Sequence, residues 1–342
     1  MNILGIETSC DDTAISIVKD GQSIKSNIIA SQVHMHEKYG GIIPEIASRE
    51  HFLTIIPTIN ESLHESGLTH KEIDCIAVTN GPGLAGSLLV GVNAAKGLGL
   101  AWDKPVMPIN HLEGHIYSGW LDNKNPDKEV GFPLICLIAS GGHTEMVLMK
   151  NHLTYEIIGK TRDDAAGEAF DKTARVLRLG FPGGPEIQKE AESANGNLDP
   201  FPRPEIKDSL DFSFSGLKTA VVNRAIKENI YPHTDFNAPN NEIVSEYSFA
   251  FQEAIVDTLI RNISRALKNF EAKGVLLGGG VAANSRLREK MAQNLDIPLI
   301  APKPYLCTDN GAMIASAAYY RIKQYGTSPT FDMDVVPNLK LH

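Results

Sequence analysis

Two histidines four residues apart, His111 and His115, are the residues whose types and spacing most directly predict chemistry. They lie in the segment Asn110-His-Leu-Glu-Gly-His-Ile-Tyr117, and on a helix both imidazoles would project from one face. Imidazole nitrogens are common ligands of zinc and iron. The pair therefore predicts half of a metal site, although two polar residues on a solvated helix would show the same spacing.

The residues between the two histidines argue against a zinc protease. Zincin proteases carry H-E-x-x-H, in which the Glu directly after the first His is the general base. Here the acid is Glu113, one position later, and one residue turns a side chain by about 100° around a helix. Gly114 would also weaken a helix by about 1 kcal/mol relative to Ala. The pair therefore lacks the arrangement expected for peptide hydrolysis.

Asp309 is the best-placed third ligand. It stands directly before a predicted helix at 311–325, where an acid is accessible and its neighbour Asn310 can cap the helix. Two histidines and one carboxylate leave open coordination positions, which is typical of a working metal rather than a closed structural site. We therefore expect one divalent metal per subunit, Fe2+ or Zn2+.

Three turns have residue types suited to binding a charged ligand. Thr8-Ser-Cys-Asp-Asp12 offers hydroxyls and two carboxylates, which could hold a cation or orient an attacking group, although an ordinary Asx turn looks the same. Ser140-Gly-Gly-His-Thr144 has paired glycines that let backbone N–H groups approach an anion. Gly278-Gly-Gly-Val-Ala-Ala-Asn284 follows a predicted strand and opens a helix, as in nucleotide sites, and Asn284 could equally be a cap. The turn at 278–284 does not match G-x-G-x-x-G, and no P-loop sequence occurs in the chain.

The elements around these turns predict a duplicated α/β fold. A strand, a polar turn and a second strand are expected at 2–18 and again at 133–149, so each half would be one α/β unit with a cleft between the two. Further strands are expected at 73–79, 106–109 and 154–158, with a final strand at 274–277. Helices are expected at 44–65, 87–101, 110–117, 167–177, 185–193, 242–270, from about 283, and at 311–325. The segment 195–241 is predicted to be rich in loops, and the tail from about 329 is predicted to form a strap.

Length and composition suit a globular protein of two domains. The chain has 342 residues, of which 21% are charged and 42% hydrophobic. We expect a first lobe at 1–130, a second at 131–325 whose last helix, 311–325, could pack back on the first, and a tail at 326–342. No basic leader and no apolar run of about 18 residues is apparent, so a cytoplasmic protein with no membrane partner is expected.

Cysteine spacing and charge exclude further classes. Cys10, Cys75, Cys136 and Cys307 form no C-x-x-C pair, which argues against a disulfide framework or a cysteine-rich zinc site. The 32 basic and 41 acidic residues give a net charge of -9, the wrong sign for binding nucleic acid through overall charge. A nucleic-acid substrate would need a local basic patch or a partner that supplies one.

Many ordered motifs, spread from Met1 to about Tyr325, resemble one family. The chain resembles the TsaD proteins, universal tRNA threonylcarbamoyladenosine transferases formerly described as O-sialoglycoprotein endopeptidases. The motifs that carry the resemblance include Gly5-Ile-Glu-Thr-Ser-Cys-Asp11, Pro44-Glu-Ile-Ala-Ser-Arg-Glu-His51, Asn80-Gly-Pro-Gly-Leu84, His111-Leu-Glu-Gly-His115, Ser140-Gly-Gly-His-Thr144, Gly167-Glu-Ala-Phe-Asp-Lys172, Pro182-Gly-Gly-Pro185, Asp211-Phe-Ser-Phe-Ser-Gly-Leu-Lys218, Gly278-Gly-Gly-Val281 and Cys307-Thr-Asp-Asn-Gly311.

The resemblance implies a fold, a reaction and a set of site residues. The fold is the duplicated one shared by actin, sugar kinases and heat-shock ATPases, with two lobes and a central ligand cleft. The reaction transfers the threonylcarbamoyl group from threonylcarbamoyl-AMP to N6 of the adenosine just 3′ of the anticodon in tRNAs reading ANN codons, and releases AMP. By motif, the metal ligands are His111, His115 and Asp309, and the adenylate contacts are Ile138, Ala139, Ser140, Gly141, Gly142, Asp171, Gly184 and Asn284.

Partners and departures follow from the same resemblance. Besides tRNA, it implies a TsaB-like inactive paralogue, a TsaE-like ATPase and a separate synthase that makes the adenylate. Asp12 and Ala139 replace the usual Glu and Val, and Gln188 replaces a common acid, so a ribose contact there is in doubt. Asp11 is our hypothesis for the base that takes the proton from N6. The basic residues that could contact tRNA are Lys160, Arg162, Lys172, Arg175 and Lys218.

The sequence also permits three alternative functions. The histidine pair permits a metalloprotease, and the three turns permit an ATPase or small-molecule kinase of the same fold. A scaffold with a vestigial site is the non-enzymatic alternative.

Overall fold

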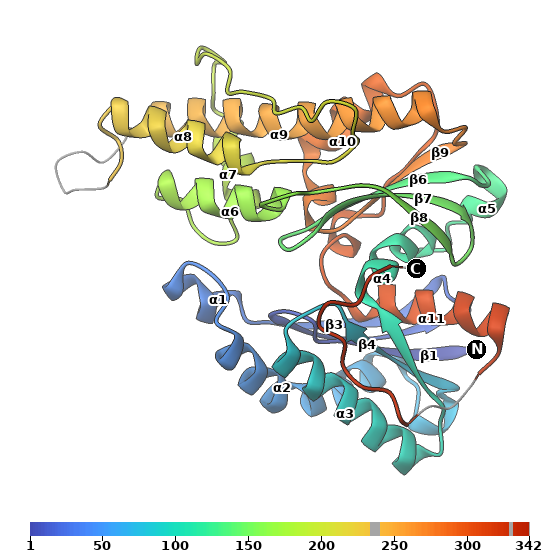
Figure 1. The fold of residues 1–342 in the computed structure, drawn as a ribbon. Helices are drawn as coiled ribbons and strands as arrows, with labels where there is room; N and C mark the ends of the chain where they lie inside the picture. The colour runs from blue at the N-terminus through green and yellow to red at the C-terminus, as the bar shows by residue number, and fades with distance from the viewer. Residues whose placement is uncertain (233–239, 328–330, 342) are drawn as a thin grey trace. The chain divides into compact units, whose positions relative to one another are not determined.

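The computed structural model describes residues 1–232, 240–327 and 331–341 (Figure 1). The chain forms two compact units. The first consists of Met1–Gly131, Met149–Tyr155 and Tyr305–His342, and the second of Phe132–Leu148 and Glu156–Pro304. The division after Gly131 lies beside the boundary expected at residue 130. Everything from Tyr305 onward belongs to the first unit, whereas the expected second lobe extended to residue 325.

The first unit is built on a five-stranded sheet in the order β3-β2-β1-β4-β5. Strands β1, β2 and β3 pair antiparallel, and β4 and β5 continue the sheet parallel to β1. The bounds are β1 Asn2–Glu7, β2 Asp12–Lys19, β3 Ser23–Ser31, β4 Cys75–Gly81 and β5 Val106–Asn110. Strand β1 is almost wholly buried, as expected for an apolar strand covered on both faces.

Different helices cover the two faces of this sheet. Leu4, Ile6, Ile15 and Ile17 share one buried core with residues of α2 (Pro44–Ser66) and α3 (Ala85–Trp102), and these two helices lie side by side in Figure 1. Successive side chains of a strand point to opposite faces, so Gly5 faces the other way. That face receives α11 (Gly311–Tyr325).

Two glycines allow α11 to begin directly against the sheet. A Cβ atom on Gly5 would lie 2.1 Å from the carbonyl oxygen of Gly311, and one on Gly311 would lie 2.6 Å from the carbonyl oxygen of Gly5. Asn310 caps the helix, because its side chain accepts a hydrogen bond from the Met313 N–H at 3.0 Å. This contact fixes the segment that precedes α11, which contains Asp309.

The second unit repeats the arrangement of the first. Its sheet has the order β10-β9-β6-β7-β8. Read from the other edge, β8-β7-β6-β9-β10, this order matches β3-β2-β1-β4-β5 of the first sheet strand for strand. As β4 and β5 run parallel to β1, β9 and β10 run parallel to β6. The bounds are β6 Leu134–Ala139, β7 Thr144–Asn151, β8 Thr154–Lys160, β9 Gly274–Gly278 and β10 Leu299–Ile300. The predicted duplication of an α/β unit is therefore confirmed.

Most elements lie where the sequence pattern predicts them. The remaining helices are α1 Val33–His36, α4 His111–Tyr117, α5 Pro126–Glu129, α6 Ala166–Val176, α7 Gly183–Ala191, α8 Ser215–Lys227, α9 Asn241–Asn269 and α10 Ser285–Asn294, with short 3-10 turns at Glu37–Tyr39, His70–Glu72, Ser118–Trp120, Gly280–Ala283 and Pro304–Leu306. The prediction that 195–241 is loop-rich is wrong for α8. The carboxylate of Asp163 accepts hydrogen bonds from the backbone N–H groups of Phe214 and Ser215 at the start of α8, so the capping residue is distant in sequence.

The C-terminal segment lies along the first unit as a strap. The Val336 N–H donates to the carbonyl of Asn80 at 2.7 Å, and the Gly83 N–H donates to the carbonyl of Pro337 at 3.1 Å. Met333 is buried in the core shared with α2 and α3. Within 1–232, 240–327 and 331–341, no helix has the length and apolar character needed to cross a membrane.

We predict that Gly5→Ala destabilises the protein, because the added methyl group would meet backbone rather than a movable side chain. The loss in free energy of unfolding should reach about 3 kcal/mol, measured by urea unfolding. The matched control is Gly97→Ala in α3, where no atom of the described part of the chain lies within 4 Å of the added Cβ and about 0.5–1 kcal/mol of stabilisation is expected. Equal stability of Gly5→Ala and the wild type would contradict the proposed contact.

Candidate metal centre and ligand-binding turns

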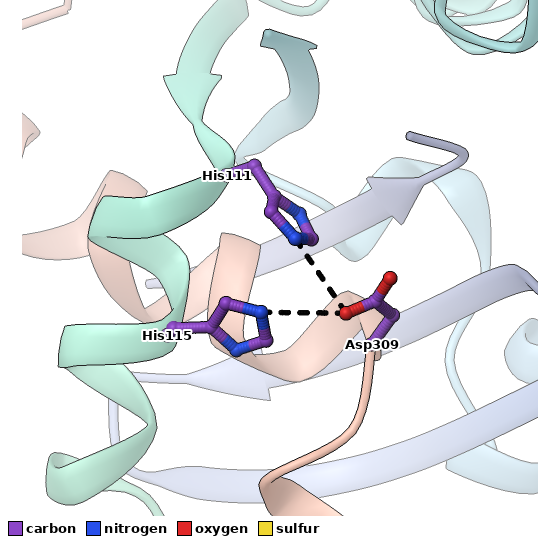
Figure 2. Close-up of side chains that lie close together, drawn as sticks. All are labelled: His111, His115 and Asp309. Carbon is purple, nitrogen blue, oxygen red and sulfur yellow. Dashed lines mark ion pairs between the residues drawn. The ribbon is translucent and has the colours of Figure 1, made fainter. Parts of the chain in front are cut away.

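The structure brings the three predicted metal ligands together in the first unit. His111 and His115 lie one turn apart on α4, with ring centroids 4.6 Å apart. One carboxylate oxygen of Asp309, Oδ1, lies 3.5 Å from Nε2 of His111 and 3.4 Å from Nε2 of His115 (Figure 2). Ligand atoms of all three residues lie within 4.8 Å of one another. The set of two imidazoles and one carboxylate suits zinc or iron.

Neighbouring residues explain where α4 begins and why it lies close to α11. Asn110 ends β5 and caps α4, accepting a hydrogen bond from the Leu112 N–H at 2.9 Å. A Cβ atom on Gly114 would lie 2.8 Å from Ile314 Cδ1 in the first turn of α11. Glycine between the two histidines therefore lets α4 approach the helix that Asp309 precedes.

His115 has the features of a side chain built to bind a cation. It is fully buried, and neither ring nitrogen makes a hydrogen bond to any residue that the structure describes. Buried polar atoms are normally hydrogen-bonded, so such a ring is unusual. Burial, with the neighbouring His111, lowers the pKa of His115, which keeps the ring neutral and its lone pair available. The donor set therefore fits a metal ion.

Glu7, which sequence reasoning missed, orients His111. This fully buried carboxylate accepts hydrogen bonds from the Thr79 hydroxyl at 2.6 Å and from Nδ1 of His111 at 3.0 Å. Burial alone would raise the pKa of Glu7, but His111 lowers it. Burial alone would lower the pKa of His111, but the negative charges of Asp309 and Glu7 outweigh this effect. They raise the pKa of His111 to about 9. The contact between Nδ1 and Glu7 directs Nε2 toward Asp309, and a metal that displaced the Nε2 proton would complete the usual carboxylate–histidine–metal arrangement.

The turn that contains Asp11 carries excess negative charge. Burial raises the pKa of Asp11, and the nearby Asp309 raises it further. Burial, with the charges of Asp11 and Asp309, raises the pKa of Asp12 to about 7, although a hydrogen bond from Ser31 opposes the shift. The neutral ring of His51 holds this turn, because Nε2 lies 3.0 Å from the Cys10 carbonyl. Asp11 is therefore a stronger base than an ordinary aspartate.

In the second unit, the predicted Ser140–Gly142 turn presents open backbone. It closes through hydrogen bonds between Ser140 and His143, in which each backbone N–H is a donor. Among the residues that the structure describes, none has an atom within 4 Å of where a Cβ atom would stand on Gly141, Gly142 or Gly184. Ile138 and Ala139 are buried at the end of β6, just before this turn. A ligand could therefore approach these backbone amides closely.

Other predicted ligand residues of the second unit also hold its helices in place. The carboxylate of Asp171 accepts a hydrogen bond from the Gly183 N–H at the start of α7 at 2.7 Å. Asn284 caps α10 and donates to the side-chain oxygen of Gln252 at 2.8 Å. The side-chain oxygen of Gln188 accepts from the Ser285 N–H at 2.8 Å. Sequence patterns gave no signal for the role of Gln252.

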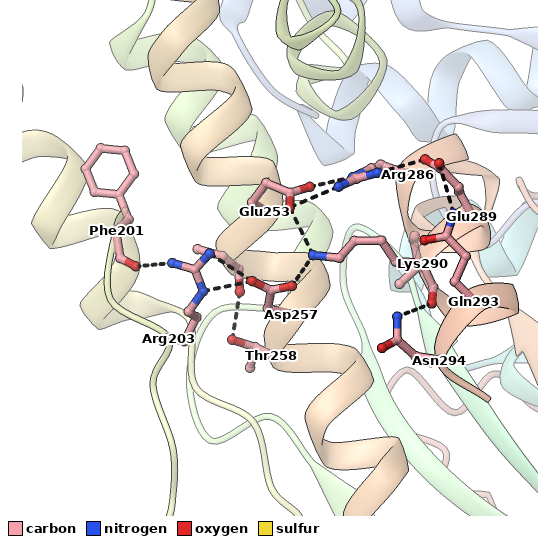
Figure 3. Close-up of polar contacts among 12 residues, drawn as sticks. Phe201, Arg203, Glu253, Asp257, Thr258, Arg286, Glu289, Lys290, Gln293 and Asn294 are labelled. Carbon is pink, nitrogen blue, oxygen red and sulfur yellow. Dashed lines mark hydrogen bonds and ion pairs between the residues drawn. The ribbon is translucent and has the colours of Figure 1, made fainter. Parts of the chain in front are cut away.

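An ion-pair network holds α10, and with it Asn284, against α9 (Figure 3). Glu253 of α9 contacts Arg286 at 2.7 Å and Lys290 at 2.9 Å, both on α10. Asp257 contacts Lys290 and, at 2.8 Å, Arg203. Because two carboxylates are shared among three cations, the network fixes the position of α10 against α9 more firmly than isolated ion pairs would.

Comparisons with known proteins identify the family of the chain. The family described as "TsaD: tRNA N6-adenosine threonylcarbamoyltransferase" matches residues 23–316. A protein of that name from Thermomicrobium roseum is 50% identical over 356 residues, covering 100% of this chain and 97% of the relative. Another from Bacillus subtilis is 46% identical over 346 residues, covering 100% and 96%.

The chain belongs to the TsaD family.

Solved structures of much lower sequence identity confirm the predicted fold class. Component A of the Acidaminococcus fermentans (R)-2-hydroxyglutaryl-CoA dehydratase matches with a TM-score of 0.54 at 16% identity, covering 94% of this chain and 98% of that one. Full-length HypF matches with a TM-score of 0.59 at 14% identity, covering 96% and 56%. At these identities the likeness concerns the fold alone, the actin-like duplicated fold.

Several of the basic residues that could contact tRNA in this TsaD protein form ion pairs with acidic side chains. Arg162 pairs with Asp211 at 2.9 Å. Lys172 pairs with Asp164 at 2.8 Å, and Lys218 lies 3.3 Å from the same carboxylate. These cations are therefore partly neutralised within the chain, and their role in binding tRNA stays a prediction.

We predict that Asp12→Asn changes how stability depends on pH. In the folded chain Asp12 keeps its proton up to about pH 7, whereas in the unfolded chain it loses it near pH 4. Asp12 therefore stabilises the wild type at low pH, and this contribution is lost as the pH rises from about 4 to about 7. Relative to the wild type, Asp12→Asn should gain up to about 4 kcal/mol over that interval.

Urea unfolding at several pH values, with a chelator present, measures this difference. Asp103→Asn, at an exposed position of the same unit, is the control and should show no such trend. Parallel stability curves for Asp12→Asn and the wild type would contradict the raised pKa.

Proposed function

We propose that this chain transfers the threonylcarbamoyl group from threonylcarbamoyl-AMP to N6 of the adenosine just 3′ of the anticodon, in tRNAs that read ANN codons. The observation that carries the proposal is the convergence of His111, His115 and Asp309, with a buried His115 that lacks a hydrogen bond within the described residues, in a TsaD-family chain. A peptidase would need a base beside the histidines. Glu113 instead bonds to Arg321 and Tyr155.

Residues of the second unit would bind the adenylate. The open backbone at Gly141, Gly142 and Gly184 suits close approach by an anionic ligand. Backbone N–H groups of the Ser140–Gly142 turn would stabilise negative charge that develops on the carbamoyl oxygen. Ile138, Ala139, Asp171 and Asn284 complete the proposed contacts.

Residues of the first unit would hold one divalent metal, Fe2+ or Zn2+. The ligands would be His111, His115 and Asp309, and Glu7 would fix the orientation and tautomer of His111. When bound, the metal would supply Lewis acidity toward the carbamoyl or carboxylate oxygens of the substrate.

The reaction exchanges one bond at the carbamoyl carbon for another. The N6 atom of adenosine forms a bond to that carbon, the bond from carbon to the phosphate oxygen breaks, and AMP leaves. The N6 atom must lose a proton, and we assign its acceptance to Asp11. The raised pKa of Asp11 supports this role, because a general base works best when its pKa approaches the operating pH.

Mass spectrometry of tRNA nucleosides tests the proposed function. We expect threonylcarbamoyladenosine after incubation of tRNA with the protein, threonylcarbamoyl-AMP and the candidate helper proteins. His115→Ala should form no detectable product, because the metal would lose a ligand. Absence of the modified nucleoside with the wild type, under every combination of helpers, would overturn the proposal.

The same assay tests the base. Asp11→Asn should lower the transfer rate by about 100-fold or more, and Asp11→Ala should do the same, without loss of bound metal. An Asp11→Ala protein that keeps the full rate would exclude Asp11 as the base while leaving the overall function intact.

We also propose that a TsaB-like paralogue docks on α2 and α3, and that a TsaE-like ATPase takes part. Phe52 is 73% exposed and Leu53 64%, and both line a groove of about 490 Å³ with Ser48, Arg49, Gly86 and Val90. Exposed apolar grooves commonly mark protein interfaces. Because the chain has a net charge of -9, a partner could also supply basic surface for tRNA.

We predict that Phe52→Asp weakens binding of the purified paralogue by about 30-fold or more, since a central aromatic residue often dominates an interface. Isothermal titration calorimetry measures the change. Ile226→Asp, at an exposed apolar position on α8 in the second unit, should bind as the wild type does. Unchanged affinity of Phe52→Asp would place the partner elsewhere.

A further inference from the structure

Glu113, which lies between the two histidines of α4, has no part in the proposed chemistry. Its side chain is fully buried. One carboxylate oxygen accepts a hydrogen bond from Nε of Arg321 at 2.6 Å, and the other accepts from the Tyr155 hydroxyl at 3.0 Å. Both oxygens are therefore engaged. A residue two positions from each histidine lies about 200° around a helix from them, so Glu113 points away from the metal ligands.

The partners of Glu113 connect the elements that carry the metal ligands. Arg321 is on α11, and Asp309 stands two residues before that helix begins. Glu113 and the histidines are on α4. The Glu113–Arg321 ion pair therefore joins the element with two ligands to the element that positions the third.

A second contact between the same two helices lies closer to the ligands. At Gly114, α4 packs against Ile314 in the first turn of α11. Arg321 lies seven residues beyond Ile314, about 10 Å further along the helix axis. Two contacts about 10 Å apart along α11 restrain both the separation of the helices and their relative rotation, which a single contact would not.

We propose that Glu113 is a positioning residue, which, through Arg321 and Tyr155, fixes α4 against α11 and so sets the geometry of His111, His115 and Asp309 for the metal. The inference rests on the metal site of the proposed function. It concerns the geometry of the ligands and requires no contact between Glu113 and the metal. Groups that orient metal ligands commonly change affinity by 10- to 100-fold when they are replaced.

Glu113→Gln is the direct test, because it removes the charge and keeps the shape of the side chain. The probe is Co2+, whose visible absorption reports the number and geometry of its ligands. We expect Co2+ to bind Glu113→Gln about 10- to 100-fold more weakly than the wild type, with a changed visible spectrum. Titrations are made well below the unfolding temperature of each protein.

Glu253→Gln is the matched control for a general loss of stability. Glu253 is also a mostly buried glutamate, paired with Arg286 and Lys290, but in the second unit. This variant should unfold at a lower temperature than the wild type while its Co2+ affinity and spectrum stay unchanged. Equal weakening of Co2+ binding in both glutamine variants would overturn the proposed role, since the effect would then follow stability.

Tyr155→Phe provides a milder variant if Glu113→Gln does not fold. It removes only the hydroxyl that donates to Glu113, and it should weaken Co2+ binding by a few-fold with a shifted spectrum. Wild-type affinity and spectrum in whichever of these two variants folds would overturn the inference. A wild type that binds no Co2+ or Zn2+ would instead contradict the metal site of the proposed function, so the two failures are distinguishable.

Discussion

The close contact between the start of α11 and strand β1 is the constraint on which the candidate metal site depends. Asp309 follows the histidines by almost two hundred residues, so no local preference can bring it to them. The contact is possible because Gly5 and Gly311 each face the backbone of the other, where a Cβ atom would lie 2.1 to 2.6 Å from a carbonyl oxygen. Backbone cannot move aside as a flexible side chain can, so this approach is strongly specified. The glycines therefore matter to the chemistry although neither is a proposed ligand.

The histidines depend on a comparable set of packing and capping interactions. Asn110 begins α4, Gly114 allows its close approach to α11, and Glu7 holds His111 through Nδ1. Each of these residues helps to orient an imidazole ring so that its Nε2 atom faces Asp309. The two histidines are therefore held by an element with regular backbone geometry, which positions side chains more accurately than loops do.

Sequence patterns predicted the ligands better than the residues that support them. Helix 311–325 and the β1–β2 hairpin were predictable because hydrophobic periodicity and capping residues are local signals. His111, His115 and Asp309 were recognisable from their residue types and from the helix starts beside them. Glu7 was not, because its partners Thr79 and His111 are 72 and 104 residues away. Helix α8 was missed for the same reason, since its cap, Asp163, comes from another motif.

The balance of buried charge also favours the proposal that a cation binds at this site. Glu7, Asp11, Asp12 and Asp309 interact electrostatically in the first unit, and the charges of Asp309 and Glu7 raise the pKa of His111 to about 9. Burying carboxylates is costly unless positive charge compensates them, which explains the raised pKa values of Asp11 and Asp12. A divalent cation would add two positive charges beside Asp309 and favour the ionised form of its neighbours. Metal binding would then be linked to the ionisation of Asp11. Asp11 would be more fully ionised, and so able to accept a proton, when the metal ligands are occupied.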